Sequence, residues 1–223
     1  MMSKSDGKDN LAHHQIKFGD ALAAIAYAHD IPYDCISEHF PQFKKERAVL
    51  KAVHVSDQIE FINKYATRKP KKILEIGAGR GEVTLTLAAM GYSVTAIEPG
   101  VDYAQLFEHS KSQLFPNQDL SYTVLNTPIH TADIDYSEYD TILMVESLEH
   151  ILAEHFDPQW ENICANFKGY FIVVNWKAYH PIAVGQYAQP HIHCRLVNDK
   201  LYNRYCEGHT TKVRDKSHLC VEL

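Results

Sequence analysis

The stretch ILEIGAGRGEVTLTLAAMGYSVTAIEP, residues 73–99, decides the fold. It begins with a short apolar run, passes through three glycines spaced two residues apart, continues with helical periodicity and ends in a second apolar run. A strand, a glycine turn, a helix and a parallel strand in this order form the repeating unit of doubly wound α/β sheets. The glycine turn lies at the carboxyl end of the first strand, where such sheets bind nucleoside-bearing ligands.

The same alternation continues to the end of the chain. Apolar runs that predict strands lie at residues 72–77, 92–99, 120–126, 139–145 and 169–176. Helical patterns lie at residues 81–91, 101–115, 147–156, 157–167 and 197–208, the last with Asn198 as its cap. Residues 210–215 and 218–223 predict a closing hairpin. We therefore expect an α/β fold over residues 71–223: a Rossmann-like, mostly parallel, doubly wound sheet with a C-terminal antiparallel hairpin.

The first 70 residues have a different pattern. Two helical stretches within residues 11–66 are broken at Pro32 and Pro41, and the charged segment 68–72 separates them from the core. We expect residues 1–70 to form a helical lid over the pocket of the core, with a dimerisation surface as the alternative, and the oligomeric state stays open.

Composition narrows the class of protein. Hydrophobic residues make up 45% and charged residues 22% of the 223 residues, as in ordinary soluble globular proteins. A net charge of −6 disfavours a DNA-binding protein, and no apolar run is long enough to span a membrane. The polar start carries no secretory signal, and the five cysteines form no CxxC pair, so we expect reduced thiols and a cytoplasmic location.

The spacing of the glycine turn narrows the ligand. The dinucleotide fingerprint needs its third glycine where Glu82 stands, and no Lys-Ser/Thr pair follows to form a phosphate loop. Glu75, two residues before the first glycine, would repel a diphosphate and suits the cationic amino end of an amino acid. Glu98 ends the next strand, where a carboxylate can accept both hydroxyls of an unphosphorylated ribose.

Three motifs in order resemble the class I S-adenosylmethionine-dependent methyltransferases over residues 56–223. These are E-x-G-x-G-x-G, the acid that ends the second strand, and YDTILMVESLEHI at residues 139–151. The resemblance implies that S-adenosylmethionine is the cofactor and that Glu98 holds its ribose. It also implies that the methionine end is lined by Glu75, Gly77, Ala78, Gly79 and Gly81. Where the family usually has an aspartate that meets the adenine amino group, this chain has Asn126, whose amide oxygen can make the same hydrogen bond.

Three other interpretations of these motifs are open. The glycines can serve only tight packing, with Glu75 and Glu98 as solvated strand ends. A dehydrogenase is a less favoured interpretation. A catalytically inactive, cofactor-binding partner subunit belongs to a different functional class, because binding motifs alone do not prove turnover.

Residues just past the predicted fourth strand are candidates for the methyl-acceptor site. Glu146, Glu149 and His150 have the i, i+3, i+4 spacing that would place them on one face of a helical turn. Two carboxylates and an imidazole can bind a divalent cation such as Mg²⁺, Mn²⁺ or Zn²⁺. A fourth ligand would then come from elsewhere in the chain.

The loop at residues 189–195, QPHIHCR, is predicted to cross this site. An E-x-x-E-H turn with a loop histidine is similar to two groups, the small-RNA 3′-terminal 2′-O-methyltransferases and the ubiquinone-pathway O-methyltransferases. In the first group the histidine stands five residues before a helix-capping residue, as His193 does before Asn198, which favours His193 over His191. The resemblance thus implies a metal site of Glu146, Glu149, His150 and His193.

Metal-free methyltransferases also carry a Glu-His pair at this turn, where it has a structural role. Without a metal, His150 or His193 becomes the natural general base. The candidate catalytic residues are therefore His150, His193 and Glu149.

A cluster of basic residues bears on the acceptor. Between residues 195 and 216, six cations exceed three carboxylates, which an RNA end could use, although a solvated face is the favoured interpretation. We expect O-methylation of a small-molecule acceptor, with an RNA 3′-terminal 2′-hydroxyl as the second choice.

Overall fold

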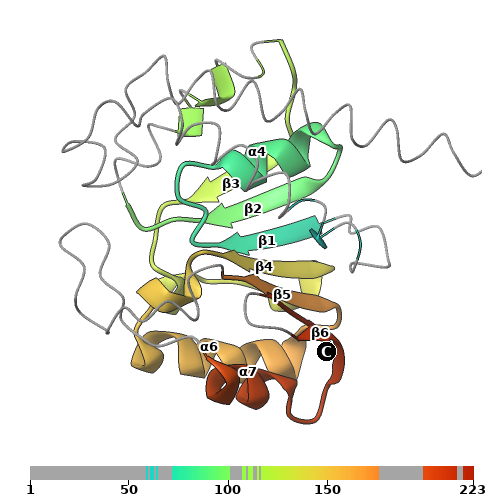
Figure 1. The fold of residues 1–223 in the computed structure, drawn as a ribbon. Coiled ribbons are helices and arrows are strands. Elements are labelled where there is room, and N and C mark those ends of the chain that lie inside the picture. Colours follow the sequence, from blue (N-terminus) through green and yellow to red (C-terminus); the bar gives the residue numbers. More distant parts are fainter. Residues whose placement is uncertain are drawn as a thin grey trace, which may run out of the picture.

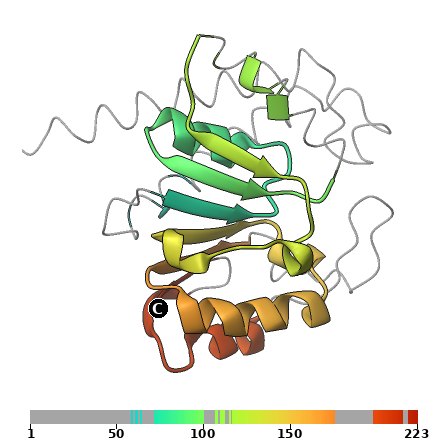
Figure 2. The same ribbon diagram turned by 180° about the vertical axis from the view of Figure 1, so that it is seen from behind.

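A computed structural model describes most of the core and a few residues before it. The described residues are 59, 61, 62, 64, 72–100, 107, 108, 110–112, 115, 117–175, 198–214 and 218–223. They form a seven-stranded sheet with helices packed against it (Figures 1 and 2). No helix among them is long and apolar enough to cross a membrane.

The elements follow the order that the sequence predicts. The strands are β1 (Lys72–Ile76), β2 (Ser93–Ile97), β3 (Tyr122–Leu125), β4 (Thr141–Val145), β5 (Tyr170–Val174), β6 (Thr210–Arg214) and β7 (His218–Glu222). The α-helices are α4 (Glu82–Ala89), α6 (Ala153–Asn166) and α7 (Asp199–Cys206). Three 3₁₀ turns are η2 (Ile129–Thr131), η3 (Tyr136–Glu138) and η4 (Leu148–His150).

The strands are arranged in the order β3-β2-β1-β4-β5-β7-β6. Strands β3, β2, β1, β4 and β5 are parallel, whereas β7 is antiparallel to both β5 and β6. The predicted doubly wound sheet with a C-terminal hairpin is confirmed. The strand order reverses between β1 and β4, so the carboxyl ends of these two strands border the crevice where such sheets bind ligands.

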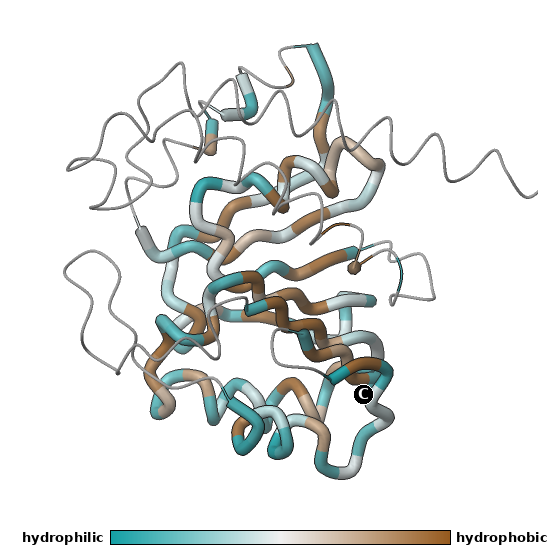
Figure 3. The backbone as a smooth tube through the Cα atoms, in the orientation of Figure 1, coloured by the Kyte–Doolittle hydropathy of each residue, from teal (hydrophilic) through white to brown (hydrophobic). Residues whose placement is uncertain are grey.

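The central strands are buried on both faces, which explains their continuous apolar sequences. All five residues of β4 and all five of β5 are buried. Ile73 and Leu143 belong to the core cluster that contains residues of α4, while Leu74 and Ile142 belong to the cluster that contains residues of α6 and α7. Figure 3 shows hydrophobic residues gathered along these strands.

The segment after β4 differs from the prediction of two helical stretches, residues 147–156 and 157–167. The structure has the short turn η4 and then one continuous helix, α6, which contains Pro158. Phe156, Trp160 and Ile163 are buried on one side of α6, on both sides of the proline in sequence. Their packing outweighs the backbone hydrogen bond that proline removes from a helix interior.

Most of the predicted lid lies outside the described residues. Ile59 and Ile62 are helical and buried in the cluster that contains α4. The ring of Phe61 stacks on His218 with centroids 4.5 Å apart, and His218 pairs with Val174 at the carboxyl end of β5. This end of the 1–70 segment therefore packs against the core near the edge of the sheet that carries the crevice.

Candidate cofactor and acceptor site

The glycine turn after β1 folds back over the end of β2. The amides of Gly77 and Ala78 both donate to the Ile97 carbonyl, at 2.8 and 3.2 Å. Gly77, Gly79 and Gly81 have φ values of 77°, 56° and 83°. These are left-handed conformations, in which a side chain is strained, so the turn requires glycine at all three positions.

The three glycines also differ in what surrounds them. A Cβ on Gly77 would overlap the side chain of Ser147, and a Cβ on Gly81 would overlap the ring of Phe107. A Cβ on Gly79 would meet no described atom within 4 Å. Gly77 and Gly81 therefore permit close packing within the protein, whereas Gly79 borders open space that a ligand can approach.

Glu98, directly after β2, is buried and tied to the glycine turn. Its Oε2 accepts a hydrogen bond from the Gly79 amide at 2.8 Å, and its Oε1 accepts one from the Gly100 amide at 2.9 Å. Burial raises the pKa of the Glu98 carboxyl, and the two backbone hydrogen bonds partly oppose this rise. Each carboxylate oxygen can accept a further hydrogen bond, so the group can still bind two hydroxyls.

Glu75 lies inside β1 and accepts a hydrogen bond from the hydroxyl of Thr84 on α4. Only 2% of Glu75 and 7% of Glu98 is exposed. The interpretation of both acids as solvated strand ends is therefore wrong. A buried carboxylate needs hydrogen bonds or a cationic partner, which is what the amino end of a ligand would supply.

Asn126, directly after β3, is oriented by the backbone around Glu98. Its Nδ2 donates to the carbonyl of Glu98 at 2.8 Å and to that of Gly100 at 3.2 Å. The donor end of the amide is thus occupied, and the amide oxygen is the end available as an acceptor. This orientation suits the predicted contact with an adenine amino group, which stays a prediction.

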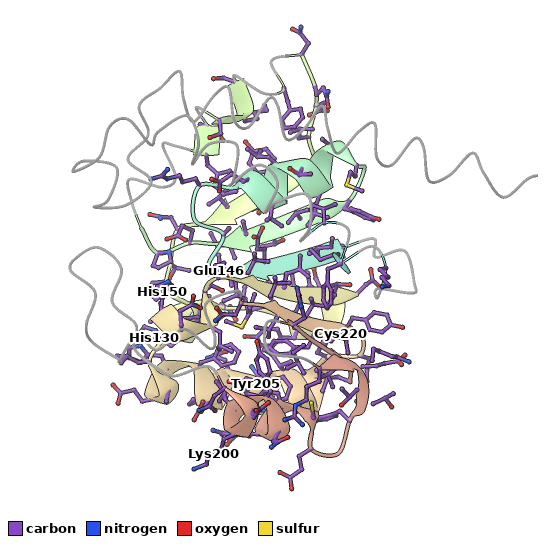
Figure 4. The ribbon with its side chains drawn as sticks, in the orientation of Figure 1. His130, Glu146, His150, Lys200, Tyr205 and Cys220 are labelled. Carbon is purple, nitrogen blue, oxygen red and sulfur yellow. The ribbon has the colours of Figure 1, made fainter. Side chains whose placement is uncertain are left out.

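Glu146 and His150 follow the carboxyl end of β4, and His150 is the last residue of η4 (Figure 4). The predicted helical face of Glu146, Glu149 and His150 is wrong. Glu146 has a left-handed φ of 51°, and its amide donates to the Val174 carbonyl of β5 at 2.8 Å. Glu146 therefore continues the sheet pairing and precedes the turn η4, instead of lying one helical turn before His150.

Glu149 and His150 are neighbours in space as well as in sequence. The Glu149 side chain is buried, and its Oε2 accepts a hydrogen bond from Nδ2 of Asn175 at 2.7 Å. Its Oε1 lies 3.7 Å from Nε2 of His150, whose side chain is 31% exposed. The pair thus consists of a buried carboxylate next to a partly exposed imidazole, an arrangement suited to proton transfer.

The predicted metal site is only partly within the described residues. Among the residues with described positions, no three His, Cys, Asp or Glu side chains are placed together to hold a metal ion. His193 lies outside the described residues. Glu146, Glu149 and His150 do not by themselves fit a metal centre.

Most of the described cations in the basic C-terminal stretch are paired with carboxylates. Three of these four cations form ion pairs: Arg204 with Asp157 at 2.7 Å, Lys212 with Glu222 at 2.7 Å and Arg214 with Asp199 at 3.2 Å. The other two cations of the stretch, Arg195 and Lys216, lie outside the described residues. These pairings favour the solvated-face interpretation over a phosphate-binding surface.

Sequence reasoning missed three polar residues of this site: Thr84, Ser147 and Asn175. The Ser147 hydroxyl donates to the Ile76 carbonyl at 2.7 Å and joins the ends of β1 and β4. Asn175 could have been predicted from the sequence, because it is the first polar residue after the apolar run of β5 and so falls at the ligand-binding edge of the sheet.

The chain matches a family model described as a methyltransferase domain over residues 25–209. It is 31% identical over 96 residues to an uncharacterized methyltransferase of Staphylococcus carnosus, a match that covers 43% of this chain and 41% of the relative. It is 32% identical over 95 residues to a ubiquinone biosynthesis O-methyltransferase of Hydrogenovibrio crunogenus, covering 42% of this chain and 38% of the relative. The matched region spans about two fifths of each relative.

A solved structure, that of TehB from Haemophilus influenzae, resembles this fold. The TM-score is 0.56 at 16% sequence identity, and the match covers 76% of this chain and 61% of TehB. At this identity the likeness extends to the fold alone.

Proposed function

This chain belongs to the methyltransferase-domain family and has the class I S-adenosylmethionine-dependent fold, and we propose that it O-methylates a small-molecule acceptor. The observation that carries the proposal is that two features follow the carboxyl ends of the neighbouring parallel strands β2, β1 and β4. One is the buried Glu98 carboxylate that meets the open Gly79 turn. The other is the Glu149–His150 pair after β4.

In the proposed complex, the chain binds S-adenosylmethionine through the residues predicted from the sequence. The methionine end would lie along Glu75, Gly77, Ala78, Gly79 and Gly81. Glu98 would accept the ribose hydroxyls, and Asn126 would accept from the adenine amino group. The buried acids, the open space at Gly79 and the oriented Asn126 amide all support this assignment.

Bound S-adenosylmethionine supplies a methyl group on a positively charged sulfur. The protein must hold the acceptor oxygen in line with that methyl group, at about 3 Å, and remove the hydroxyl proton. His150 is the described residue suited to take the proton, and the Glu149 carboxylate stabilises the imidazolium that results. His193 stays a second candidate base outside the described residues.

A metal-assisted mechanism has less support. The donor set within the described part of the chain does not fit a metal ion, so the proposed proton transfer runs through His150 without one. An Mg²⁺, Mn²⁺ or Zn²⁺ site completed by His193 stays a prediction that chelation can test.

A small molecule is favoured over an RNA 3′ end because of the charges and the relatives. Three of the four described cations in the C-terminal stretch are paired with carboxylates. One relative is a ubiquinone biosynthesis O-methyltransferase. The segment that includes Ile59, Phe61 and Ile62 packs near the carboxyl end of β5, which supports the proposed lid over the acceptor.

The proposal is tested by methyl transfer from radiolabelled S-adenosylmethionine with the purified chain. The acceptor probes are 3,4-dihydroxybenzoate and a short single-stranded RNA with a free 3′ end, each with and without EDTA. We expect label in the catechol and no loss with EDTA. Label in the RNA alone would favour an RNA 3′-terminal 2′-O-methyltransferase. Loss of methyl transfer with EDTA would support the metal-assisted mechanism. Binding of S-adenosylhomocysteine without transfer to either probe would favour an inactive partner subunit.

The raised pKa of Glu98 predicts how cofactor binding depends on pH. Only the ionised carboxylate accepts both ribose hydroxyls, so affinity is full above the pKa of Glu98 in the free protein and is lost as the pH falls through it. Because burial raises this pKa from 4.5, the loss begins at a higher pH than for an exposed glutamate. Calorimetric titration with S-adenosylhomocysteine over a pH series should show it.

The control for this pH series is Glu98→Gln, which cannot ionise. Its affinity should be weaker at neutral pH by about 1–3 kcal/mol and nearly flat over the same range. An unchanged slope in Glu98→Gln would show that another group causes the pH dependence.

Thr84 is expected to support cofactor binding through Glu75. Thr84→Val removes the hydroxyl that donates to the Glu75 carboxylate and keeps the shape of the side chain. We expect S-adenosylhomocysteine to bind about 10-fold more weakly, since a hydrogen bond to a charged group is lost. 5′-Methylthioadenosine, which lacks the amino-acid end, should bind to Thr84→Val with the same affinity as to the native chain. An equal loss of affinity for both ligands would show that Thr84 does not act through the amino-acid end of the cofactor.

A further inference from the structure

Asn175 connects two loops at the acceptor edge of the sheet. It directly follows β5, is fully buried, and contacts Glu149 of η4, 26 residues earlier in the chain. Strands β4 and β5 are parallel neighbours paired through Val145 and Val174, so both residues lie just beyond the same end of the sheet. The Asn175 side chain is therefore anchored to a rigid strand while it holds a group on a turn.

Each oxygen of the Glu149 carboxylate has a described side chain near it. Nδ2 of Asn175 donates a hydrogen bond to Oε2 at 2.7 Å, whereas Nε2 of His150 lies 3.7 Å from Oε1, within ion-pair range but too far for a hydrogen bond. Because the carboxylate is planar, a short hydrogen bond to one oxygen restricts where the other oxygen points. The contact with Asn175 thus sets the direction in which Glu149 faces His150.

The orientation of the Asn175 amide is set by the same contact. If the Asn175 amide were flipped, its oxygen would face Oε2 of Glu149. The two oxygens are both acceptors and would repel each other, because neither carries a proton. With the amine toward Glu149, Oδ1 of Asn175 is buried and finds no hydrogen-bond partner within the described structure. A buried amide oxygen without a partner is unfavourable for stability, so an apolar side chain of the same shape would suit the fold better.

We propose that Asn175 is a positioning residue for methyl transfer, one that holds the Glu149 carboxylate toward Nε2 of His150. The negative charge of Glu149 then favours the neutral tautomer with its proton on Nε2, which leaves Nδ1 to take the proton of the acceptor hydroxyl. This assignment rests on the proposed role of His150 as the general base.

The first test is a double-mutant cycle of Asn175→Leu and Glu149→Gln with 3,4-dihydroxybenzoate as acceptor. Asn175→Leu should lower kcat about 10- to 100-fold, part of what a general base contributes, with KM and the Kd of S-adenosylhomocysteine within about 2-fold. In the Glu149→Gln background the same change should cost nothing further, since Asn175 acts through Glu149. Losses that multiply in the double variant would overturn the proposal.

Thr141→Val is the matched control. Thr141 is also fully buried, and its Oγ1 likewise lacks a hydrogen-bond partner in the described structure, but it lies at the opposite end of β4. Its replacement should leave kcat within about 2-fold, as expected for a change remote from the reacting groups. If Asn175→Leu does not fold, Asn175→Ala removes the same donor without adding a bulkier side chain.

The second test needs no acceptor. In ¹⁵N-histidine spectra at about pH 9, where imidazole is neutral, the His150 signals should report a proton on Nε2. Asn175→Leu should reduce that preference, and Thr141→Val should not; His150→Gln assigns the signals. An unchanged tautomer in Asn175→Leu would overturn the proposal. If the tautomer shifts but His150→Gln keeps full activity, the base assignment under the proposed function is what fails.

Discussion

Replacing Gly79 with valine is expected to abolish binding of S-adenosylhomocysteine while leaving the fold in place. Gly79 has a left-handed φ of 56°, and a side chain there would enter space that no described atom fills. We propose that this space receives the methionine end of the cofactor. We expect the Kd measured by calorimetry to rise at least about 100-fold, which corresponds to about 2.8 kcal/mol.

Gly91 offers the matched control for this substitution. It lies after the carboxyl end of α4 and has a φ of 92°, and a Cβ on it would likewise meet no described atom within 4 Å. Gly91→Val should therefore lower the free energy of unfolding by about 1–2 kcal/mol through backbone strain alone, as Gly79→Val should. Its Kd for S-adenosylhomocysteine should stay near that of the native chain. Equal loss of binding in both variants would mean that strain, and not the ligand site, is responsible.

Loss of His150 is expected to have the largest effect on turnover. His150→Gln should lower kcat with 3,4-dihydroxybenzoate by about 100- to 10,000-fold, the usual contribution of a general base. The Kd of S-adenosylhomocysteine should hardly change, because no cofactor contact is assigned to His150. Single-turnover methyl transfer measured beside calorimetry separates the two effects.

His155→Gln is the control for the loss of a histidine near this site. His155 lies in the first turns of α6, and its ring stacks on that of His130 with centroids 3.9 Å apart. Its replacement should leave kcat within a few-fold. Full activity in His150→Gln would contradict its role as the base and direct attention to His193.

The fold could be predicted because its signals are local in sequence. The glycine turn between β1 and α4, the end of α4 near Gly91 and the hairpin of β6 and β7 each depend on a few adjacent residues. The helix cap is the clearest case: Asn198 accepts hydrogen bonds from the amides of Lys200 and Leu201, as its position before a helical pattern predicts. Order along the chain then determines the topology of a doubly wound sheet.

The acceptor site could be predicted only in part, because its contacts join distant segments. The spacing of Glu146, Glu149 and His150 predicts a shared helical face, but the Glu146 amide pairs with β5 and its backbone is left-handed. Sequence patterns do not reveal such an exception at a residue other than glycine. The contact between Asn175 and Glu149 depends in the same way on which strands are neighbours.

The central claim is that the Gly79 turn and the acids Glu75 and Glu98 bind S-adenosylmethionine. Calorimetric titration of the native chain with S-adenosylhomocysteine and, separately, with NAD tests it most directly. We expect S-adenosylhomocysteine to bind with a Kd of about micromolar or tighter, near −8 kcal/mol, and NAD to give no heat of binding. Binding of NAD without binding of S-adenosylhomocysteine would contradict the account.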